Sequence, residues 1–237
     1  MLQKNIDKET SMTMFIDNII ARPYQFKDKA KSFVIDLGGS TGWFGAIFKT
    51  KKNTIISMDI HADKLLEKYD YIDERVQYIK GDLLELPFKD NIADVVIARA
   101  SLHHIPRNIH VALSQIKRIL KDDGIIIIQE PNYLNPFAYI IRNYFPMEKW
   151  HDEDEKPFKI KDLIKDISLH FHIKEIQYYY LFSYPGPHII ARLPNILKSC
   201  SRKLLYLIVR LDNLLMNCKF LQNYCGYISI IGDKHVI

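Results

Sequence analysis

Short apolar runs separated by helical patterns dominate the chain from residue 33 to residue 130. Each run is about 4–8 residues long and rich in β-branched side chains, as strands are. In chain order they are FVIDL, TIISMDI, RVQYIKGD, ADVVIARA and GIIIIQE. Apolar strands separated by enough chain for a helix are typical of a parallel sheet covered on both faces. The pattern predicts a doubly wound α/β core over this part of the chain.

The clearest helical period lies between the last two of these runs, in RNIHVALSQIKRILKDDG. Ile109, Leu113, Ile116 and Leu120 share one face of the predicted helix. Gly124 is expected to follow the end of this helix, because glycine commonly occupies the position after a helical C-terminus.

Beyond Glu130 the pattern loosens into a segment rich in proline and aromatic residues, for which we expect a short helix and a long loop. The runs FHIKEIQYYYLFS and YCGYISIIGDK alternate like strands, and residues 193–221 between them predict a long helix. An opening helix is predicted over residues 9–20. The expected organisation is a single domain over residues 1–237, with a core over 30–135 and with 136–160 and 187–222 as substrate-side or lid insertions.

The first apolar run leads into the glycine-rich turn of VIDLGGSTGWFG, residues 34–45. A dinucleotide-binding turn has the spacing G-x-G-x-x-G. If the pattern began at Gly38, its second and third glycines would fall at positions 40 and 43, where this chain has Ser40 and Trp43. No Gly-Lys-Ser/Thr tripeptide follows, which argues against a Walker loop. Asp36, just before the turn, would repel a phosphate but favour a cation. The turn is therefore not expected to hold phosphate.

Asp36, Gly38 and Gly42 form the pattern D-x-G-x-x-x-G after a first strand. This pattern resembles the first motif of class I methyltransferases that use S-adenosylmethionine (SAM), a ligand with an ammonium and a sulfonium. Ser40 departs from the family, which often has a further glycine at that position.

Later stretches resemble the rest of the family's cofactor-binding residues. Asp59 ends TIISMD, and the resemblance implies that it receives both ribose hydroxyls while Ile60 packs on the adenine. Asp82 matches the acid that accepts the adenine amino hydrogen, with Leu83 beside it, and Arg99–Ser101 would lie beside the methionine part of SAM. The predicted cofactor-binding residues are Asp36, Gly38, Gly39, Ser40, Gly42, Asp59, Ile60, Asp82, Leu83, Arg99 and Ala100, with Tyr24 closing over the cofactor.

The closest resemblance is to small-molecule methyltransferases, including the ubiquinone and menaquinone biosynthesis enzymes. LKDDGIIIIQEP matches the segment that leads into and through the family's fifth strand. The resemblance implies a Rossmann-like, doubly wound seven-stranded sheet of order 3-2-1-4-5-7-6, with helices on both faces. YCGYISIIGDK fits its antiparallel seventh strand. It also implies SAM as cofactor, S-adenosylhomocysteine as product, and no metal.

His103, His104 and Glu130 are the candidates for catalysis. An imidazole titrates near neutral pH and is suited to act as a general base. LHHI, however, also occurs in family members with different substrates, so a packing or loop-shaping role stays open. Glu130 leaves the fifth strand toward the expected cleft and could touch substrate. Asp94 is expected to be structural, and WHDEDE a solvated acidic loop, because metal ligands normally converge from several elements.

Composition and missing motifs exclude some classes of methyl acceptor. The net charge is only +5, and no dense block of Lys and Arg indicates nucleic-acid binding. Enzymes that methylate amino groups of nucleic acids resemble one another through an [Asp/Asn/Ser]-Pro-Pro-aromatic box, and this chain has RASLHH at that place. The Pro-Cys pair that carries the nucleophile of C5-pyrimidine methyltransferases is also missing, because no proline precedes a cysteine. We therefore expect a small-molecule or lipid- or glycan-type acceptor, whose pocket the aromatic residues from Tyr133 to Trp150, Tyr178 to Tyr180 and Tyr184 could line.

The helix predicted over residues 193–221 has an apolar centre, LLYLIVRLDNLL, flanked by Lys and Arg. It could lie on an anionic membrane, cover the site as a lid, or form a dimer face, so both a monomer and a homodimer stay open. The three cysteines are odd in number and lack CxxC spacing, which is typical of reduced thiols. With a polar N-terminus and no long apolar run, we expect a cytoplasmic protein, with peripheral membrane contact as an open alternative.

Two rival functions follow from the same residues. A nicotinamide-dependent oxidoreductase is disfavoured by the glycine spacing and by Asp82. A SAM-binding domain that has lost catalysis and serves as a scaffold would keep the same motifs, because a fold does not fix a function.

Overall fold

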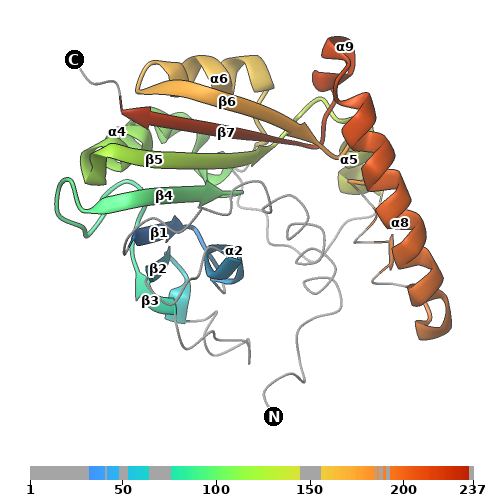
Figure 1. Ribbon diagram of the computed structural model, residues 1–237, viewed down its shortest axis with the longest axis horizontal. Coiled ribbons are helices and arrows are strands. Elements are labelled where there is room, and N and C mark those ends of the chain that lie inside the picture. Colours follow the sequence, from blue (N-terminus) through green and yellow to red (C-terminus); the bar gives the residue numbers. More distant parts are fainter. Residues whose placement is uncertain are drawn as a thin grey trace.

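The computed structural model describes residues 32–40, 42–47, 53–63, 76–144, 156–184, 186, 189–190 and 193–234. Within them, seven strands form a single sheet in the order β3-β2-β1-β4-β5-β7-β6 (Figure 1). This order confirms the fold that the sequence predicts. The strands are β1 (Phe33–Leu37), β2 (Thr54–Asp59), β3 (Val76–Lys80), β4 (Ala93–Arg99), β5 (Leu120–Pro131), β6 (Phe171–Tyr179) and β7 (Tyr227–Lys234).

Strand direction divides the sheet into two parts. β1 pairs in parallel with β2 on one side and with β4 on the other, and β5 continues the parallel part beyond β4. β7 lies between β5 and β6 and is antiparallel to both, as predicted. The chain leaves β1 toward β2 and β3 and returns to β4, so strand order reverses beside β1. The carboxyl ends of β1 and β4 therefore border the crevice where α/β sheets bind ligands.

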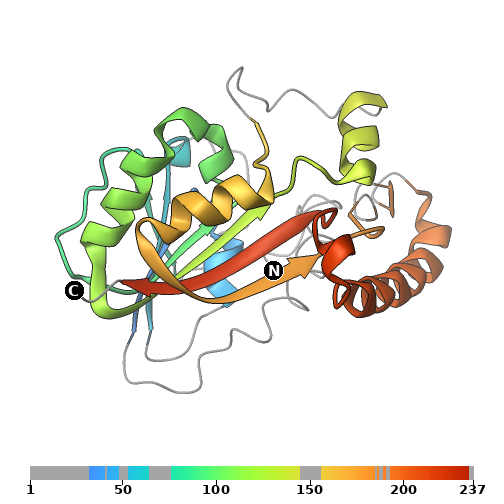
Figure 2. The same ribbon diagram turned by 90° about the horizontal axis from the view of Figure 1, so that it is seen from above.

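Helices cover both faces of the sheet, as predicted. Figure 2 shows α4 and α6 together on one face, whereas α5, α8 and α9 gather at one end of the molecule. α2 and α8 both contribute to the apolar cluster on the opposite face. The helices within the described residues are α2 (Trp43–Ile47), α4 (Ile109–Ile119), α5 (Pro136–Tyr144), α6 (Ile160–Ser168), α8 (Asn195–Leu215) and α9 (Lys219–Gln222), with 3-10 turns η2 (Leu102–His104) and η3 (Pro106–Asn108).

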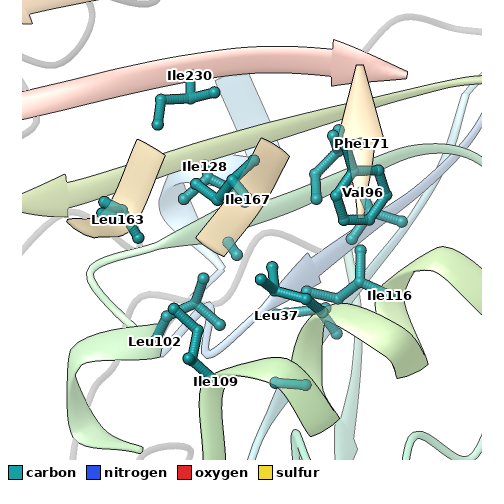
Figure 3. Close-up of a cluster of buried hydrophobic side chains, with 14 of the residues drawn as sticks. Leu37, Val96, Leu102, Ile109, Ile116, Ile128, Leu163, Ile167, Phe171 and Ile230 are labelled. Atoms are coloured by element: carbon teal, nitrogen blue, oxygen red, sulfur yellow. The ribbon is translucent and has the colours of Figure 1, made fainter. Parts of the chain in front are cut away.

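The larger apolar core lies between the sheet and the α4–α6 layer. Figure 3 shows Ile116 of α4 and Ile167 of α6 directed toward sheet residues such as Val96 and Ile128. All four side chains are fully buried. Burying an aliphatic side chain of this size contributes about 1.5–3 kcal/mol, so this layer fixes the sheet against which the site is built.

The end of α4 differs from the prediction. The helix stops at Ile119, Leu120 already has extended backbone angles and pairs with Ala93, and Gly124 lies inside β5. The expectation that Gly124 follows the helix is therefore wrong. Leu120 is buried in the strand as it would have been on the helix face, so apolar spacing alone did not distinguish the two conformations.

Two other expected helices have different outcomes. The helix predicted over residues 193–221 is present, but it is divided into α8 and α9 by a turn at residues 216–218. The helix predicted over residues 9–20 lies outside the described residues. A short helix was expected after Glu130, and α5 occupies that place.

Asp94 has the structural role that was expected of it. One carboxylate oxygen accepts a hydrogen bond from the Phe33 backbone N–H at 2.7 Å, and the other pairs with Lys121 Nζ at 2.7 Å. Asp94 therefore joins the first residues of β1, β4 and β5 at the end of the sheet opposite the glycine turn.

Candidate functional site

The glycine turn after β1 is attached to the neighbouring strand β2. The backbone N–H groups of Gly38 and Gly39 both donate to the Met58 carbonyl, at 2.8 and 3.2 Å. The Gly42 N–H donates to the Gly39 carbonyl at 2.8 Å and closes the turn before α2. The carboxyl ends of β1 and β2 are thereby held at a fixed separation.

Two positions of the turn need glycine because of their backbone conformation. Gly38 and Gly42 have φ values of +65° and +70°, which disfavour any L side chain. A Cβ at Gly42 would also lie 2.8 Å from Cε1 of Tyr78. Ser40, which stands where the family often has glycine, has φ +51°. Ser40 therefore adopts a left-handed conformation that glycine would adopt without strain, at a cost of about 1–2 kcal/mol for a residue with a side chain.

Asp36 lies beneath the turn, with only 1% of its surface exposed. Its Oδ2 accepts a hydrogen bond from the Gly45 backbone N–H at 2.9 Å, which links the end of β1 to α2. A Cβ at Gly45 or at Gly39 would come within 2.8 or 2.7 Å of the same oxygen, so both glycines make room for the carboxylate. Asp36 was expected at the mouth of the turn, whereas the structure places it under the backbone. Direct contact with a ligand stays a prediction.

Three buried polar atoms around the turn lack a hydrogen-bond partner among the described residues. They are Asp36 Oδ1, Ser57 Oγ of β2 and Ser101 Oγ after β4. Asp36 and Ser57 are partners in the β1–β2 register, and Gly38 packs against the Ser101 side chain. Because buried polar groups are nearly always satisfied, the end of the sheet forms a polar cradle suited to a hydrogen-bonding, cationic ligand or to ordered water.

Charge around Asp36 is balanced by Arg99 at the end of β4. Burial raises the pKa of Asp36 from 3.8 to about 6, whereas the hydrogen bond from Gly45 and the Arg99 charge oppose that rise. The Arg99 guanidinium lies 5.1 Å from the centre of the Phe44 ring and 6.0 Å from that of Tyr227. These aromatic faces hold the guanidinium beside the carboxyl ends of the central strands.

Asp59 lies at the carboxyl end of β2, where it was predicted. Its Oδ2 accepts a hydrogen bond from the Ser40 N–H of the glycine turn at 3.1 Å, and its Oδ1 accepts one from the His61 N–H at 2.8 Å. The side chain of Ile60 beside it is 52% exposed. A carboxylate and an exposed apolar side chain therefore stand together at the edge of the turn.

Asp82 and Leu83 follow β3 on the same edge of the sheet. Asp82 is exposed, and its Oδ1 accepts a hydrogen bond from the Leu84 N–H at 2.9 Å. Leu83 is half-buried and packs against the larger core. The local turn thus directs one acid and one apolar side chain to the end of β3.

Glu130 lies behind the β4 strand end instead of facing the solvent. It is fully buried, and its Oε1 accepts hydrogen bonds from the backbone N–H groups of Ser101 and Leu102, at 3.0 and 2.7 Å. Its Oε2 lies 2.7 Å from Nδ1 of His103, which is 6% exposed. Glu130 therefore fixes the η2 turn and orients the His103 ring, and the half-buried His104 ring packs 4.4 Å from that of His103.

The turn after β4 also depends on an unusual backbone conformation. Ala100 has φ +49°, and its N–H donates to the Gln129 carbonyl of β5 at 2.7 Å. This conformation turns the chain away from the sheet immediately after Arg99. Arg99–Ser101 thus lie at the strand end where sequence analysis put them.

Several site residues were missed at the level of sequence. Ser57 is the polar residue that interrupts the apolar run from Ile55 to Met58, and this was a signal that could have been used. Tyr227 lies more than a hundred residues from Arg99 along the chain, so no local pattern reveals their contact. Tyr227 stacks on Tyr184 with ring centres 5.8 Å apart and meets Tyr180 edge-on at 6.0 Å.

Other predicted residues lie outside the described part of the chain. These are Tyr24, the aromatic residues at 145–150 and the acidic stretch at 150–155. Among the residues that the structure does describe, no group of three or more His, Cys, Asp or Glu could hold a metal ion. None of the helices in that part of the chain is long and apolar enough to cross a bilayer.

Comparison with known proteins agrees with this geometry. Residues 35–128 match the family model described as a methyltransferase domain. An uncharacterized protein of Methanocaldococcus jannaschii is 34% identical over 139 residues, which are 58% of this chain and 55% of that protein. The demethylmenaquinone methyltransferase of Staphylococcus aureus is 39% identical over 57 residues, 24% of this chain and 23% of that protein. The matched stretch thus spans little more than half the length of the first relative and less than a quarter of the second.

Solved structures show the same fold over nearly the whole chain. A SAM-dependent methyltransferase from Archaeoglobus fulgidus superposes with a TM-score of 0.58 at 21% identity, and the match covers 93% of this chain and 94% of that chain. At this level of identity the likeness concerns the fold alone.

The raised pKa of Asp36 predicts how stability depends on pH. Because the folded pKa of about 6 lies above the unfolded value of 3.8, the folded chain binds this proton more tightly. The resulting stabilisation is complete below pH 3.8 and is lost as the pH rises through about 6. Compared with Asp36→Asn, the wild-type protein should lose about 3 kcal/mol of unfolding free energy over this range, at about 1.4 kcal/mol for each pKa unit.

Urea unfolding of the wild type and Asp36→Asn across this pH range measures the difference. Asp63→Asn is the control, because Asp63 is an exposed carboxylate paired with Lys80 at 2.7 Å. A difference between wild type and Asp36→Asn that does not change with pH would contradict the account.

Proposed function

We propose that this protein, which belongs to the class I S-adenosylmethionine-dependent methyltransferases, transfers the methyl group of SAM to a small-molecule acceptor. The observation that carries the proposal is the junction of the glycine turn and β2, where Asp59 accepts the Ser40 N–H beside the exposed Ile60. This junction lies at the crevice beside β1 where α/β sheets bind ligands. Its residues are those that the family resemblance assigns to the adenosine part of the cofactor.

The residues present fit the adenosine half of SAM. Gly38 and Gly39 let the turn pack directly on Ser101, Ser57 and Asp36, the three residues of the polar cradle. The Asp59 carboxylate has lone pairs for ribose hydroxyls, and Ile60 offers an apolar face to adenine. Asp82 would accept the adenine amino hydrogen. We assign these roles because the three strand ends lie side by side in the sheet.

The residues at the β1 and β4 ends fit the methionine half. SAM carries an ammonium and a sulfonium, and a cation near Asp36 would favour its ionised form. Arg99 would pair with the carboxylate of the methionine part, because a guanidinium can donate two parallel hydrogen bonds to a carboxylate. The chemistry that SAM supplies when bound is an electrophilic methyl group. The protein's own contribution is then to hold the acceptor in line and to exclude water.

His103 is the residue we propose for proton transfer, with Glu130 as the residue that positions it. A carboxylate beside Nδ1 favours the tautomer whose proton is on Nδ1, which leaves Nε2 as the proton acceptor. Glu130 would thus position His103, and His104 would pack beside it. An acceptor that loses a proton during methylation needs such a base, whereas one that does not would leave His103 as a packing residue.

We expect His103→Gln to lower turnover of a proton-losing acceptor about 10²–10⁴-fold, because that is the usual contribution of a general base. SAM affinity should not change. The measurement is the pH profile of kcat for wild type, His103→Gln and the matched control His104→Gln, with an acceptor found by screening. Equal turnover in wild type and His103→Gln would leave His103 with the packing role.

The acceptor we propose is a small molecule with apolar character. The rings of Tyr180, Tyr184 and Tyr227 form a connected aromatic group beside Arg99, at the end of β4. Aromatic side chains with a few polar groups are typical of small-molecule sites. One curated relative acts on demethylmenaquinone by name, so quinone-like, lipid and glycan precursors form the first screening set.

Calorimetric titration with SAM and S-adenosylhomocysteine, with NADH as control, tests the proposal. We expect micromolar binding of both adenosyl ligands and no binding of NADH. Asp59→Ala should weaken SAM binding about 100-fold, through the loss of two charge-assisted hydrogen bonds at about 1.5 kcal/mol each. Asp63→Ala, which removes an exposed carboxylate four residues away, should bind like the wild type.

Asp59 also accepts two backbone hydrogen bonds, so the folded state of Asp59→Ala must be checked by thermal unfolding, and Asp59→Asn serves as a milder second variant. A folded wild-type protein that binds neither SAM nor its product would contradict the proposal. SAM binding without turnover of any acceptor would instead favour the scaffold alternative.

A further inference from the structure

Helix α8 leaves one apolar face uncovered. Ile196, Leu204, Leu207, Leu211 and Leu214 recur at spacings of three, four or eight residues and therefore lie along one side of the helix. Their exposed fractions are 87%, 58%, 60%, 49% and 69%. We call these five residues the outer stripe. Together they present on the order of 500 Å² of apolar surface, at the upper end of what monomeric proteins expose in one patch.

The outer stripe is not the side by which α8 packs on the rest of the protein. The opposite side of α8 is already packed, with Leu205 and Val209 buried in the cluster that contains Phe44. Asp212 on that inner side is fully buried and accepts hydrogen bonds from the N–H groups of Phe182 and Ser183 and from the Ser183 hydroxyl. α8 is therefore anchored by its inner side, and Figure 1 shows it at the edge of the molecule, away from the central sheet.

The charges of this region have a single sign at the surface. Asp212 is the only acidic residue between residues 193 and 224, and it is buried in the contacts just described. Lys203 and Arg210 are exposed, and their helical positions border the outer stripe on one side. The basic residues of the segment are Lys198, Arg202, Lys203, Arg210 and Lys219.

We propose that α8 docks on an anionic lipid membrane, with the outer stripe in the boundary between headgroups and acyl chains. A long helix with one apolar side and a basic polar side is typical of helices that lie in the plane of the membrane surface. Lys203 and Arg210 are placed to meet lipid phosphates while the leucines are buried. α8 lies on the bilayer instead of spanning it, because no helix among the described residues is suited to cross one.

A second copy of this chain fits the outer stripe less well. Two-fold pairing of α8 with itself would bring Lys203 and Arg210 of both copies to the same interface. Asp212, the one acid of the segment, is buried and cannot neutralise them. Like charges brought together across an interface oppose association, whereas an anionic surface attracts the same residues.

The inference deepens the proposed function, and its statement about the acceptor rests on that function. The inner side of α8 shares its cluster with Phe44, whose ring lies 5.1 Å from the Arg99 guanidinium at the site. A docked α8 would place the bilayer on the side of the molecule where this shared cluster lies. The acceptor class favoured by this placement is a lipid-soluble molecule that enters the site from the membrane.

Sedimentation of the full-length chain with vesicles tests the proposal. We expect binding to phosphatidylcholine vesicles with about 30 mol% phosphatidylglycerol, and at least tenfold weaker binding to pure phosphatidylcholine. Leu207→Glu/Leu211→Glu should lower the partition coefficient at least tenfold, and Lys203→Gln/Arg210→Gln about 25-fold, at roughly fivefold for each charge near an anionic surface. Leu169→Glu is the matched control, because Leu169 is 64% exposed at the end of α6, away from α8.

Three results would overturn the proposal: no vesicle binding, equal binding to neutral and anionic vesicles, or unchanged binding of the Leu207→Glu/Leu211→Glu variant.

A dimer in sedimentation equilibrium that this variant abolishes, without vesicle binding by the wild type, would assign the stripe to a second copy. SAM titration of the same variant separates the two proposals. Retained SAM binding by the variant, with its vesicle binding lost, isolates the membrane surface. Vesicle binding by a wild-type protein that does not bind SAM contradicts only the enzyme proposal.

Discussion

The rest of the site depends on one buried carboxylate. Asp36 lies under the glycine turn, where it accepts the Gly45 N–H and lies close to Gly39. Burying a carboxylate costs free energy unless hydrogen bonds or a nearby cation stabilise its charge. The turn therefore needs glycines above and beside it, and Arg99 is held nearby by two aromatic rings. The position of the turn also determines where the Ser40 N–H donates its hydrogen bond to Asp59.

Much of this arrangement could be predicted from the sequence, because the proposed cofactor site is made of strand ends. A parallel strand is recognisable by its apolar run, and the residue after it lies at a known edge of the sheet. The places of Asp59 and Asp82 at strand ends follow from that rule, whereas their expected roles in cofactor binding came from the family resemblance. The order of the strands, with β7 between β5 and β6, came instead from the family resemblance, because no local pattern specifies which strands pair.

The errors and omissions come from contacts between distant parts of the chain. Glu130 was expected to face a cleft, but the backbone N–H groups after β4 need an acceptor and Glu130 supplies it. Gly124 was expected to end a helix, but pairing of Leu120 with Ala93 begins β5 earlier. Helix α6 was missed, although Ile160, Leu163 and Ile167 have helical spacing and are buried. The weaker patterns after Glu130 hid it.

The molecule thus combines two kinds of surface. The end of the parallel strands carries the acids, the glycine turn and Arg99, which are suited to a charged cofactor. The segments after Glu130 contribute the tyrosine group and α8, whose apolar outer stripe and basic border are suited to a lipid surface. The inner side of α8 packs in the same apolar cluster as Phe44, whose ring lies beside Arg99.

We expect the buried Asp36 carboxyl to lose its proton when the positive charge of SAM binds beside it. Calorimetric titration with SAM near pH 6, in two buffers of different ionisation enthalpy, measures the protons exchanged on binding. With a pKa of about 6 in the free protein, Asp36 is half protonated there, so binding that favours its ionised form should release about half a proton. Asp36→Asn should release none. Equal proton release from the wild type and Asp36→Asn, or none from either, would contradict the account.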